Sequence, residues 1–117
     1  MARTPTTSDA FNAVAEPQRR RIIDLLAHGE QSVNDIAAAL QKRQPQVSKH
    51  LRVLREVGLV RARGEGRQQF YTLNSEALRP IYEWVSPYEQ TWRERFERLD
   101  ELLDELQTQP NEDGLGA

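Results

Sequence analysis

Apolar residues recur at helical spacing in the first third of the chain. Residues 8 to 15 place their apolar side chains on one side, and Ser8 and Asp9 can cap this stretch as a short helix. Pro17 suits the first turn of a second helix, because its missing N–H costs nothing there. We expect that helix to run to about residue 27 and to end at Gly29.

A third and a fourth helix follow, with a short turn between them. Ser32 caps the third helix, whose apolar stripe has the spacing i, i+3, i+4, i+7 in Val33, Ile36, Ala37 and Leu40. Lys42 and Arg43 form the turn. Pro45 opens the fourth helix and Gly58 ends it. Its inward positions are Val47, Leu51, Leu54 and Val57.

The next segment predicts a β-hairpin. Residues 59 to 63 form a short strand, residues 64 to 66 a glycine-rich tip, and residues 67 to 72 the return strand. Two strands are not stable alone in water, so we expect the hairpin to pack on the helices.

The last third of the chain predicts helix again, starting near Asn74 and kinked at Pro80 and Pro87. From Val85 onward the apolar residues follow a heptad, and the opposite face is acidic. A partner helix buries such a seam, as does the first helix of the same chain; we expect both, with a homodimer favoured. The predicted dimer interface consists of Phe11, Val85, Tyr88, Trp92, Phe96, Leu99, Leu102, Leu103 and Leu106.

The order helix–helix–helix–hairpin–helix is that of a winged helix-turn-helix. The predicted fold class is therefore mainly α, with a small β-hairpin and a long C-terminal dimerisation helix. We expect a flexible tail at 1–7, the winged helix-turn-helix at 8–73, the dimerisation region at 74–109 and a second flexible tail at 110–117.

Composition narrows the possible classes of protein. A chain of 117 residues holds one domain with an arm, which excludes a multidomain enzyme. There is no Cys, which excludes disulfides and thiolate sites, and two His are too few for an all-His metal site. The longest apolar run, Ile36 to Leu40, is far shorter than the roughly 20 residues that span a bilayer. No signal peptide is visible, so we expect a cytoplasmic protein without a membrane partner.

The net charge of -2 conceals a strong asymmetry. Residues 1 to 73 carry 12 basic and 7 acidic side chains, whereas residues 74 to 117 carry 4 basic and 11 acidic ones. Residues 42 to 67 alone hold 8 basic and 2 acidic side chains. Because salt screens charges beyond about 8 Å, such a local field is enough to bind a polyanion.

The fourth helix and the hairpin carry the residue types that read DNA. Gln44 and Gln46 can bond an adenine bidentately, and Lys49, Arg52 and Arg55 can reach guanine or phosphate. Basic residues in the hairpin would lie along the backbone or enter a minor groove. The predicted DNA-binding residues are Arg43, Gln44, Gln46, Ser48, Lys49, Arg52, Arg55, Arg61, Arg63 and Arg67.

Three segments resemble the ArsR type of bacterial transcriptional repressor. Residues 11 to 26 are similar to the opening motif of that family, residues 44 to 60 to its recognition helix and following strand, and residues 66 to 71 to its wing. The resemblance implies a homodimer that binds a palindromic operator in double-stranded DNA and is released by an inducer. The inducer, a small molecule or a protein, is not identifiable from the residues.

Two departures from the family pattern matter. The Cys pairs and the C-terminal His of its metal sensors are absent, so the metal-sensing role is not carried over and no metal or cofactor is expected. Residues 84 to 88, followed by Trp92, resemble a metal-free branch of the family. Carboxylates such as Glu83, Glu94 and Asp100 could hold a hard cation, but their pattern favours a solvated helix face. Arg43 stands where the family usually has a Ser or Thr cap, which weakens the cap by about 1 kcal/mol.

Other interpretations remain open at this stage. The winged fold could serve as a protein-interaction module that uses its acidic C-terminal helix. Residues 19 to 21, all Arg, could clamp phosphate, or one of them could pair with Asp24 or Glu16. Ser48 and His50 lie two apart on a helix and do not face each other, so they are no catalytic pair, and we expect no enzyme.

Overall fold

The computed structural model describes residues 9–116, and the side chains of residues 9–108. The predicted tail at 1–7 lies outside the described residues. The chain separates into two units, residues 1–81 and residues 82–117. The first unit thus includes the segment that follows the hairpin, and the division into domains after residue 73 stays a prediction.

Two helices open the first unit. The short helix α1 (Ala10–Val14) is capped by Asp9, whose carboxylate accepts a hydrogen bond from the Asn12 N–H at 2.7 Å. Helix α2 (Pro17–Leu26) begins with its proline in the first turn, as predicted. Both begin where the sequence places a side-chain acceptor or a proline, because these satisfy or remove the otherwise unbonded N–H groups.

The helix-turn-helix consists of α3 (Val33–Leu40) and α4 (Gln44–Glu56). Ser32 caps α3 as predicted, since its Oγ accepts from the Asp35 N–H at 3.1 Å. Between the two helices, Gln41 adopts a left-handed conformation with φ of 57°. That conformation favours glycine, and it turns the chain sharply enough for α4 to start at once.

The sheet has three strands, one more than predicted. Strands β2 (Val60–Glu65) and β3 (Gln68–Leu73) form the hairpin, and β1 (Gln31–Ser32) adds to the other side of β3 in the order β1-β3-β2. All pairs are antiparallel, with Ala62 opposite Tyr71 and Ser32 opposite Phe70. The turn of the hairpin lies later in the chain than the tip predicted at 64–66. Gly64 lies within β2, and Gly66, with φ of 63°, begins the turn.

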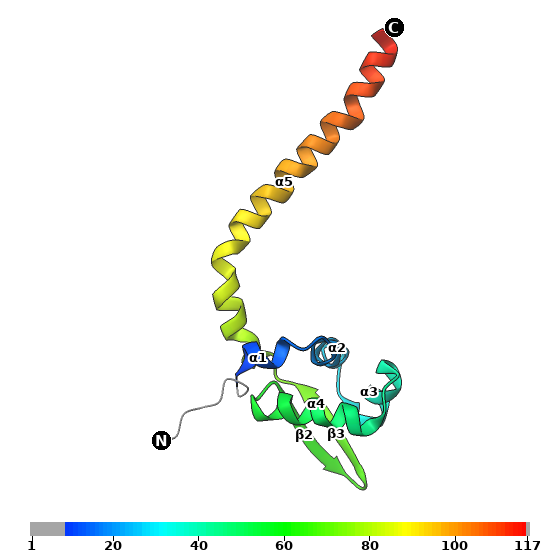
Figure 1. Cartoon of the computed structure of the whole chain (residues 1–117), viewed down its shortest axis with the longest axis vertical. Helices are drawn as coiled ribbons and strands as arrows, with labels where there is room; N and C mark the ends of the chain where they lie inside the picture. Colours follow the sequence, from blue (N-terminus) through cyan, green and yellow to red (C-terminus); the bar gives the residue numbers. More distant parts are fainter. Residues whose placement is uncertain (1–8, 117) are drawn as a thin grey trace. The chain divides into compact units, whose positions relative to one another are not determined.

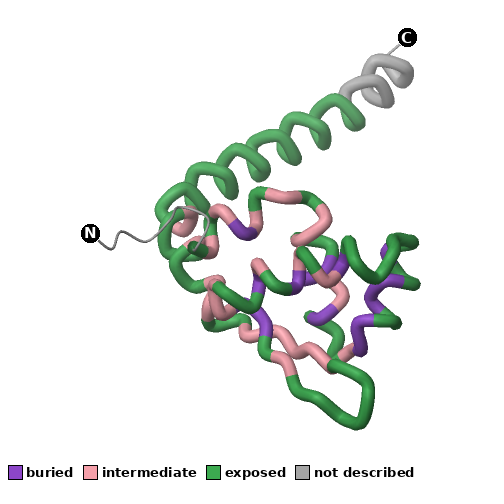
Figure 2. Tube along the Cα trace, turned by 60° about the horizontal axis from the view of Figure 1, so that its bottom comes forward, coloured by how far each residue is buried: buried purple, intermediate pink, exposed green. Residues whose placement is uncertain are grey.

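The core of the first unit joins α2, α3 and α4 to the base of the hairpin. Figure 2 shows its buried residues gathered in these elements, while the far end of the hairpin is exposed. The inward positions Val47, Leu51 and Leu54 of α4 are at most 1% exposed, which confirms them. The whole core comprises Ala13, Ile22, Ile23, Leu26, Val33, Ile36, Ala37, Leu40, Val47, Leu51, Leu54, Leu59 and Val60.

A 3-10 turn, η2 (Ser75–Leu78), leads into the long helix α5 (Arg79–Gly116). Pro80 lies in its first turn, where proline is tolerated, and Pro87 lies in its interior. Figure 1 shows α5 bending in its yellow part, the stretch that contains Pro87. The backbone is helical to Gly116, whereas a tail was predicted from residue 110.

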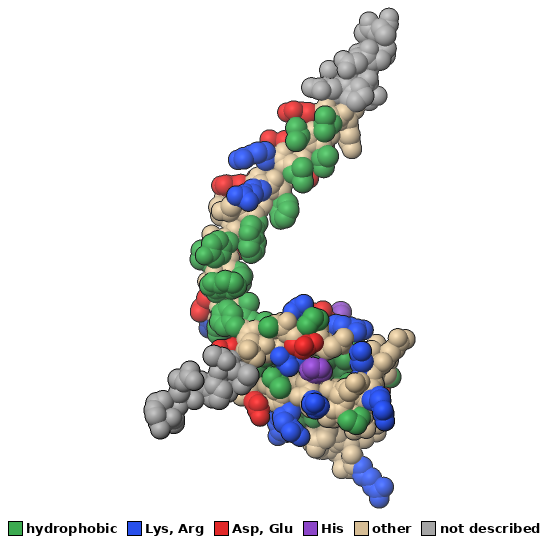
Figure 3. All heavy atoms as spheres, in the orientation of Figure 1, with side chains coloured by type: hydrophobic (Ala, Val, Ile, Leu, Met, Phe, Trp, Pro, Cys, Tyr) green, Lys and Arg blue, Asp and Glu red, His purple; other side chains and the backbone are tan. Residues whose placement is uncertain are grey.

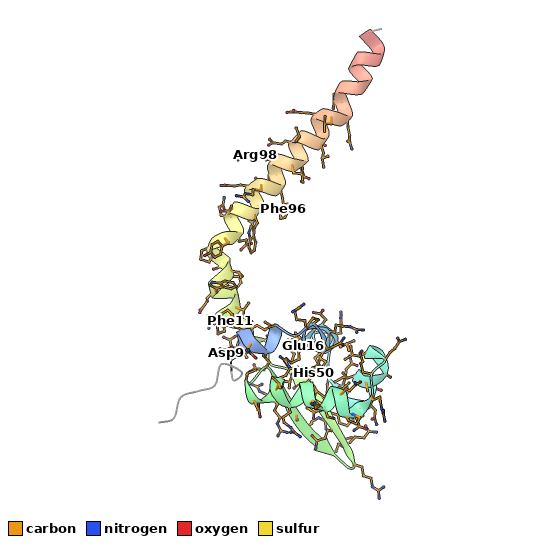
Figure 4. The ribbon with its side chains drawn as sticks, viewed as in Figure 1. Asp9, Phe11, Glu16, His50, Phe96 and Arg98 are labelled. Carbon is orange, nitrogen blue, oxygen red and sulfur yellow. The ribbon has the colours of Figure 1, made fainter. Side chains whose placement is uncertain are left out.

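Helix α5 exposes one apolar stripe along its length. Figure 3 shows apolar side chains on one side of its upper half and charged ones on the other, and Figure 4 shows Phe96 and Arg98 on opposite sides. None of the described helices is both long and apolar enough to cross a membrane. The exposed large residues of the stripe include Trp84, Tyr88, Trp92, Phe96, Leu99, Leu102, Leu103 and Leu106.

Candidate nucleic-acid interface

Helix α4 separates its side chains into a buried and an exposed face. The buried face packs Val47, Leu51 and Leu54 into the core. The exposed face carries Gln44, Gln46, Lys49, Arg52 and Arg55, and Ser48 beside them is partly buried. The structure thus brings the predicted polar and basic residues of this helix together on one solvent-facing surface.

The first turn of α4 is stabilised in an unusual way. Arg43 occupies the N-cap position and its side chain offers no acceptor. The side chain of Gln46 folds back instead, and its Oε1 accepts from the Arg43 N–H at 3.4 Å. The side-chain amide of Gln46 thus contributes to the cap of α4 while remaining exposed to solvent.

A recess of about 250 Å³ lies beside the exposed face of α4. The apolar residues of its lining are Leu40 and Val47, and the basic ones are Lys42 and Lys49. Its remaining lining residues are Gln18, Gln46 and His50. Apolar and basic side chains therefore meet in the lining of this recess.

His50 lies at the inner edge of this surface and is partly buried. Burial lowers the pKa of His50 below its ordinary value of 6.5, and the positive charges of Arg19 and Lys49 act in the same direction. Glu16 opposes them; Figure 4 labels both Glu16 and His50. The neutral imidazole is thus favoured in the isolated protein.

Two arginines of α2 have a structural task that the sequence did not indicate. Arg19 donates from Nε to the carbonyl oxygen of Ala13 at 2.6 Å. Arg20 donates from Nη1 to that of Val14 at 2.7 Å. Both therefore satisfy carbonyl groups at the end of α1, where helical partners are missing. The roles predicted for these arginines, a phosphate clamp or pairing with Asp24 or Glu16, did not include these bonds to backbone carbonyl groups.

The three arginines of the hairpin are all exposed but differ in their partners. Arg67 lies in the turn, and Figure 3 shows a basic side chain at the far end of the hairpin. Arg63 forms ion pairs with Glu30 and Glu65, each at 2.7 Å. Sequence reasoning missed Glu30, since a partner 33 residues away leaves no periodic or local signal.

The described residues contain no group of three or more His, Asp or Glu side chains that could hold a metal ion. The acidic side chains of α5 within residues 79–108 thus line a helix face without converging on a point.

Comparison with known proteins assigns this chain to a family. A family model described as "Bacterial regulatory protein, arsR family" matches residues 16–62, from the N-cap of α2 into β2. The chain is also 31% identical to the transcriptional repressor SdpR of Bacillus subtilis (strain 168), over 67% of this chain and 87% of that repressor. The chain belongs to the arsR family of bacterial regulatory proteins.

Solved structures agree with this ArsR-family assignment. One, a possible transcriptional regulator for arsenical resistance, is 36% identical with a TM-score of 0.62, over 73% of this chain and 85% of that one. Another is the homodimeric winged helix-turn-helix DNA-binding domain Mb0332 of Mycobacterium bovis, 32% identical with a TM-score of 0.56, over 77% and 91%. This ArsR-family chain is thus a winged helix-turn-helix transcriptional regulator, in which α3 and α4 form the helix-turn-helix and the β2–β3 hairpin is the wing.

Proposed function

We propose that this ArsR-family chain forms a homodimer that binds a palindromic operator in double-stranded DNA and represses transcription. The exposed face of α4 carries this proposal, because it presents glutamine and basic side chains on a helix whose other face is locked into the core. A helix of this kind fits the major groove, where base edges differ in their donors and acceptors.

Each part of the surface receives a role in this proposal. Gln44 and Gln46 read base edges from the first turn of α4, and Ser48 is short enough to let the helix approach closely. Lys49, Arg52 and Arg55 contact guanine or phosphate further along. Arg43 and Lys42 add positive charge at the turn, and the recess between Lys42 and Lys49 accepts a phosphate oxygen. Arg61 and Arg67 of the wing contact the backbone outside the major groove.

The apolar stripe of α5 supports the homodimer. Leu99, Leu103 and Leu106 are each about half exposed, and a second copy of the same helix would cover them. Phe11 of α1 is 42% exposed and belongs to the same predicted interface. The homodimeric Mb0332 domain supports this assembly, since it shares the fold. In the dimer, the two copies of α4 must match successive major grooves, roughly 34 Å apart.

Repression follows from occupancy of the operator in the cytoplasm, where bacterial DNA lies. An inducer would act by changing the distance between the two recognition helices, because both half-sites must be engaged together. The competing role, a protein-interaction module built on α5, is not favoured. Such a module has no need for a concentration of positive charge on the exposed face of α4.

The decisive experiment is selection of duplexes from a random pool, followed by band shifts at several salt concentrations. We expect a palindrome with half-sites about one helical turn apart, and a log–log salt slope near -0.9 for each phosphate contact. Gln46→Ala should relax base preference at one position in each half-site, at a cost of about 1–3 kcal/mol. Gln107→Ala on α5 is the matched control and should leave base preference unchanged. Failure of the full-length dimer to bind any duplex in dilute salt would overturn the proposal.

A further inference from the structure

Arg63 is the most heavily engaged side chain of the wing. Its Nε and Nη2 donate to the two carboxylate oxygens of Glu30 at 2.7 Å and 2.8 Å, which is a bidentate pair. Its Nη1 donates to Glu65 at 2.7 Å. The guanidinium also lies 4.8 Å from the centre of the Phe70 ring, so cation–π attraction adds to the ion pairs. Each of the three nitrogens of Arg63 thus donates a hydrogen bond to a carboxylate of the protein, although its side chain remains 51% exposed.

These contacts join the wing to the start of the helix-turn-helix. Glu30 directly precedes β1, and β1 ends at Ser32, the cap of α3. Strand β1 pairs with β3 through two residues only, Gln31 and Ser32, which is a short ladder for an element that has to hold the wing in place. Arg63 crosses the sheet from β2 to Glu30 and stacks on Phe70, its register partner on β3. One side chain therefore ties all three strands together.

The charges around Arg63 oppose a direct contact with DNA. Glu30 and Glu65 outnumber the single guanidinium, so the cluster is negative overall. The bonds to Arg63 lower the pKa of Glu30, which keeps this carboxylate ionised. A phosphate would have to displace one carboxylate and would lie beside the other. Among the described residues, Arg61 and Arg67 have no carboxylate partner and meet no such competition.

We propose that Arg63 is a positioning residue that holds the wing against the helix-turn-helix through Glu30, and that Arg61 and Arg67 make the wing's contacts with DNA. This inference rests on the proposed DNA-binding function and corrects the equal treatment of the three arginines that the sequence invited. It also makes Glu30, an acidic residue, a contributor to the binding of a polyanion.

The sign of the Glu30→Gln effect separates the two roles of Arg63. If Arg63 positions the wing, Glu30→Gln weakens operator binding, by about two- to fivefold for each wing of the dimer. If Arg63 contacts phosphate in competition with Glu30, the same change frees the guanidinium and strengthens binding. Asp24→Asn, on the exposed face of α2, removes the same charge without touching the wing and corrects for net charge.

Salt dependence and a double variant complete the test. Arg63→Gln should weaken binding while leaving the log–log salt slope unchanged, and Glu30→Gln combined with Arg63→Gln should be no weaker than either alone. Arg67→Gln should reduce the magnitude of the slope by about 0.9 for each lost contact, about 1.8 in a dimer. A slope change of that size for Arg63→Gln, or stronger binding by Glu30→Gln than by Asp24→Asn, would overturn the proposal.

A measurement without DNA keeps this inference separate from the proposed function. Hydrogen exchange of the full chain should show faster exchange of amides in residues 60–73 for both Arg63→Gln and Glu30→Gln, with α2 unchanged. If the wild-type protein binds no duplex but the exchange result holds, the DNA-binding proposal fails and the positioning role of Arg63 stands. If hairpin exchange is unaltered in both variants, the positioning role of Arg63 fails, whatever the protein binds.

Discussion

The two units of this ArsR-family regulator differ in how far they bury their large apolar side chains. In the first unit, α2, α3, α4 and the base of the hairpin bury one another, and Ile22, Ile36 and Leu54 are fully buried. In α5, large apolar residues of the same kind remain about half exposed along a single stripe. The comparison teaches that the winged helix-turn-helix holds its own core, whereas α5 requires a second surface to bury its stripe.

The largest expected effect comes from a substitution that tests whether α5 holds the dimer together. Leu99→Arg places a charge in the stripe of both copies, and each lost leucine removes about 1.5–3 kcal/mol of burial. We expect the dimer to dissociate at least about 100-fold more readily in sedimentation equilibrium. Gln90→Arg adds the same charge on the polar side of α5 and should leave the dimer intact. A Leu99→Arg protein that sediments as the wild type does would refute the heptad assignment.

The next effect tests the core of the first unit against the stripe. Leu54 is 0% exposed, so Leu54→Ala should lower the free energy of unfolding by about 2–5 kcal/mol. Leu102→Ala, in a residue that is 51% exposed, should change it by less than about 0.5 kcal/mol. Both should be measured by urea unfolding in the Leu99→Arg background, where no dimer contact contributes. Equal losses at the two positions would contradict the comparison.

A smaller effect concerns the turn of the helix-turn-helix. Gln41 has φ of 57°, a conformation that costs an ordinary residue about 1 kcal/mol and glycine almost nothing. Gln41→Gly should therefore raise the free energy of unfolding by about 1 kcal/mol in the same monomeric background. Gln41→Ala keeps the left-handed cost and should bring no gain. If the alanine variant gains as much as the glycine variant, backbone strain is not the cause.

The smallest effect is the pH dependence that His50 contributes. Its pKa is lowered in the folded protein, so below 6.5 the unfolded chain binds a proton that the folded chain resists. His50 therefore reduces stability as the pH falls below 6.5 and has no effect above it. Thermal unfolding at about pH 7.5 and about pH 5.5 should show a larger loss for the wild type than for His50→Gln. Parallel losses in the two proteins would show that other groups cause the dependence.

Local signals in the sequence predicted most of the first unit correctly. The caps Asp9 and Ser32 and the proline at the start of α2 marked helix starts, because each acts within one turn of its own position. The spacing of Val47, Leu51 and Leu54 predicted the buried face of α4, and with it the exposed face that carries the candidate site. These features depend on residues three or four apart, so the chain order alone reveals them.

Contacts between distant residues could not be predicted in this way. Strand β1 has only two residues, too few for a periodic pattern, and it exists because β3 offers it an edge. The arginines of α2 satisfy carbonyls of α1, and nothing in their own spacing indicates this. Gln46 was predicted as a base reader, and only the structure reveals its second task at the cap of α4.

The sequence by itself determined which helices form, which face of α4 meets solvent and where positive charge gathers, since these follow from side-chain chemistry at short spacing. Tertiary structure alone decided that Arg63 pairs with Glu30, while Arg61 and Arg67 have no carboxylate partner among the described residues. The three arginines are chemically identical, and Arg61 and Arg63 even share a face of β2. Their difference arises from what the fold places opposite each one, and a carboxylate brought there from 33 residues away is a property of the folded chain.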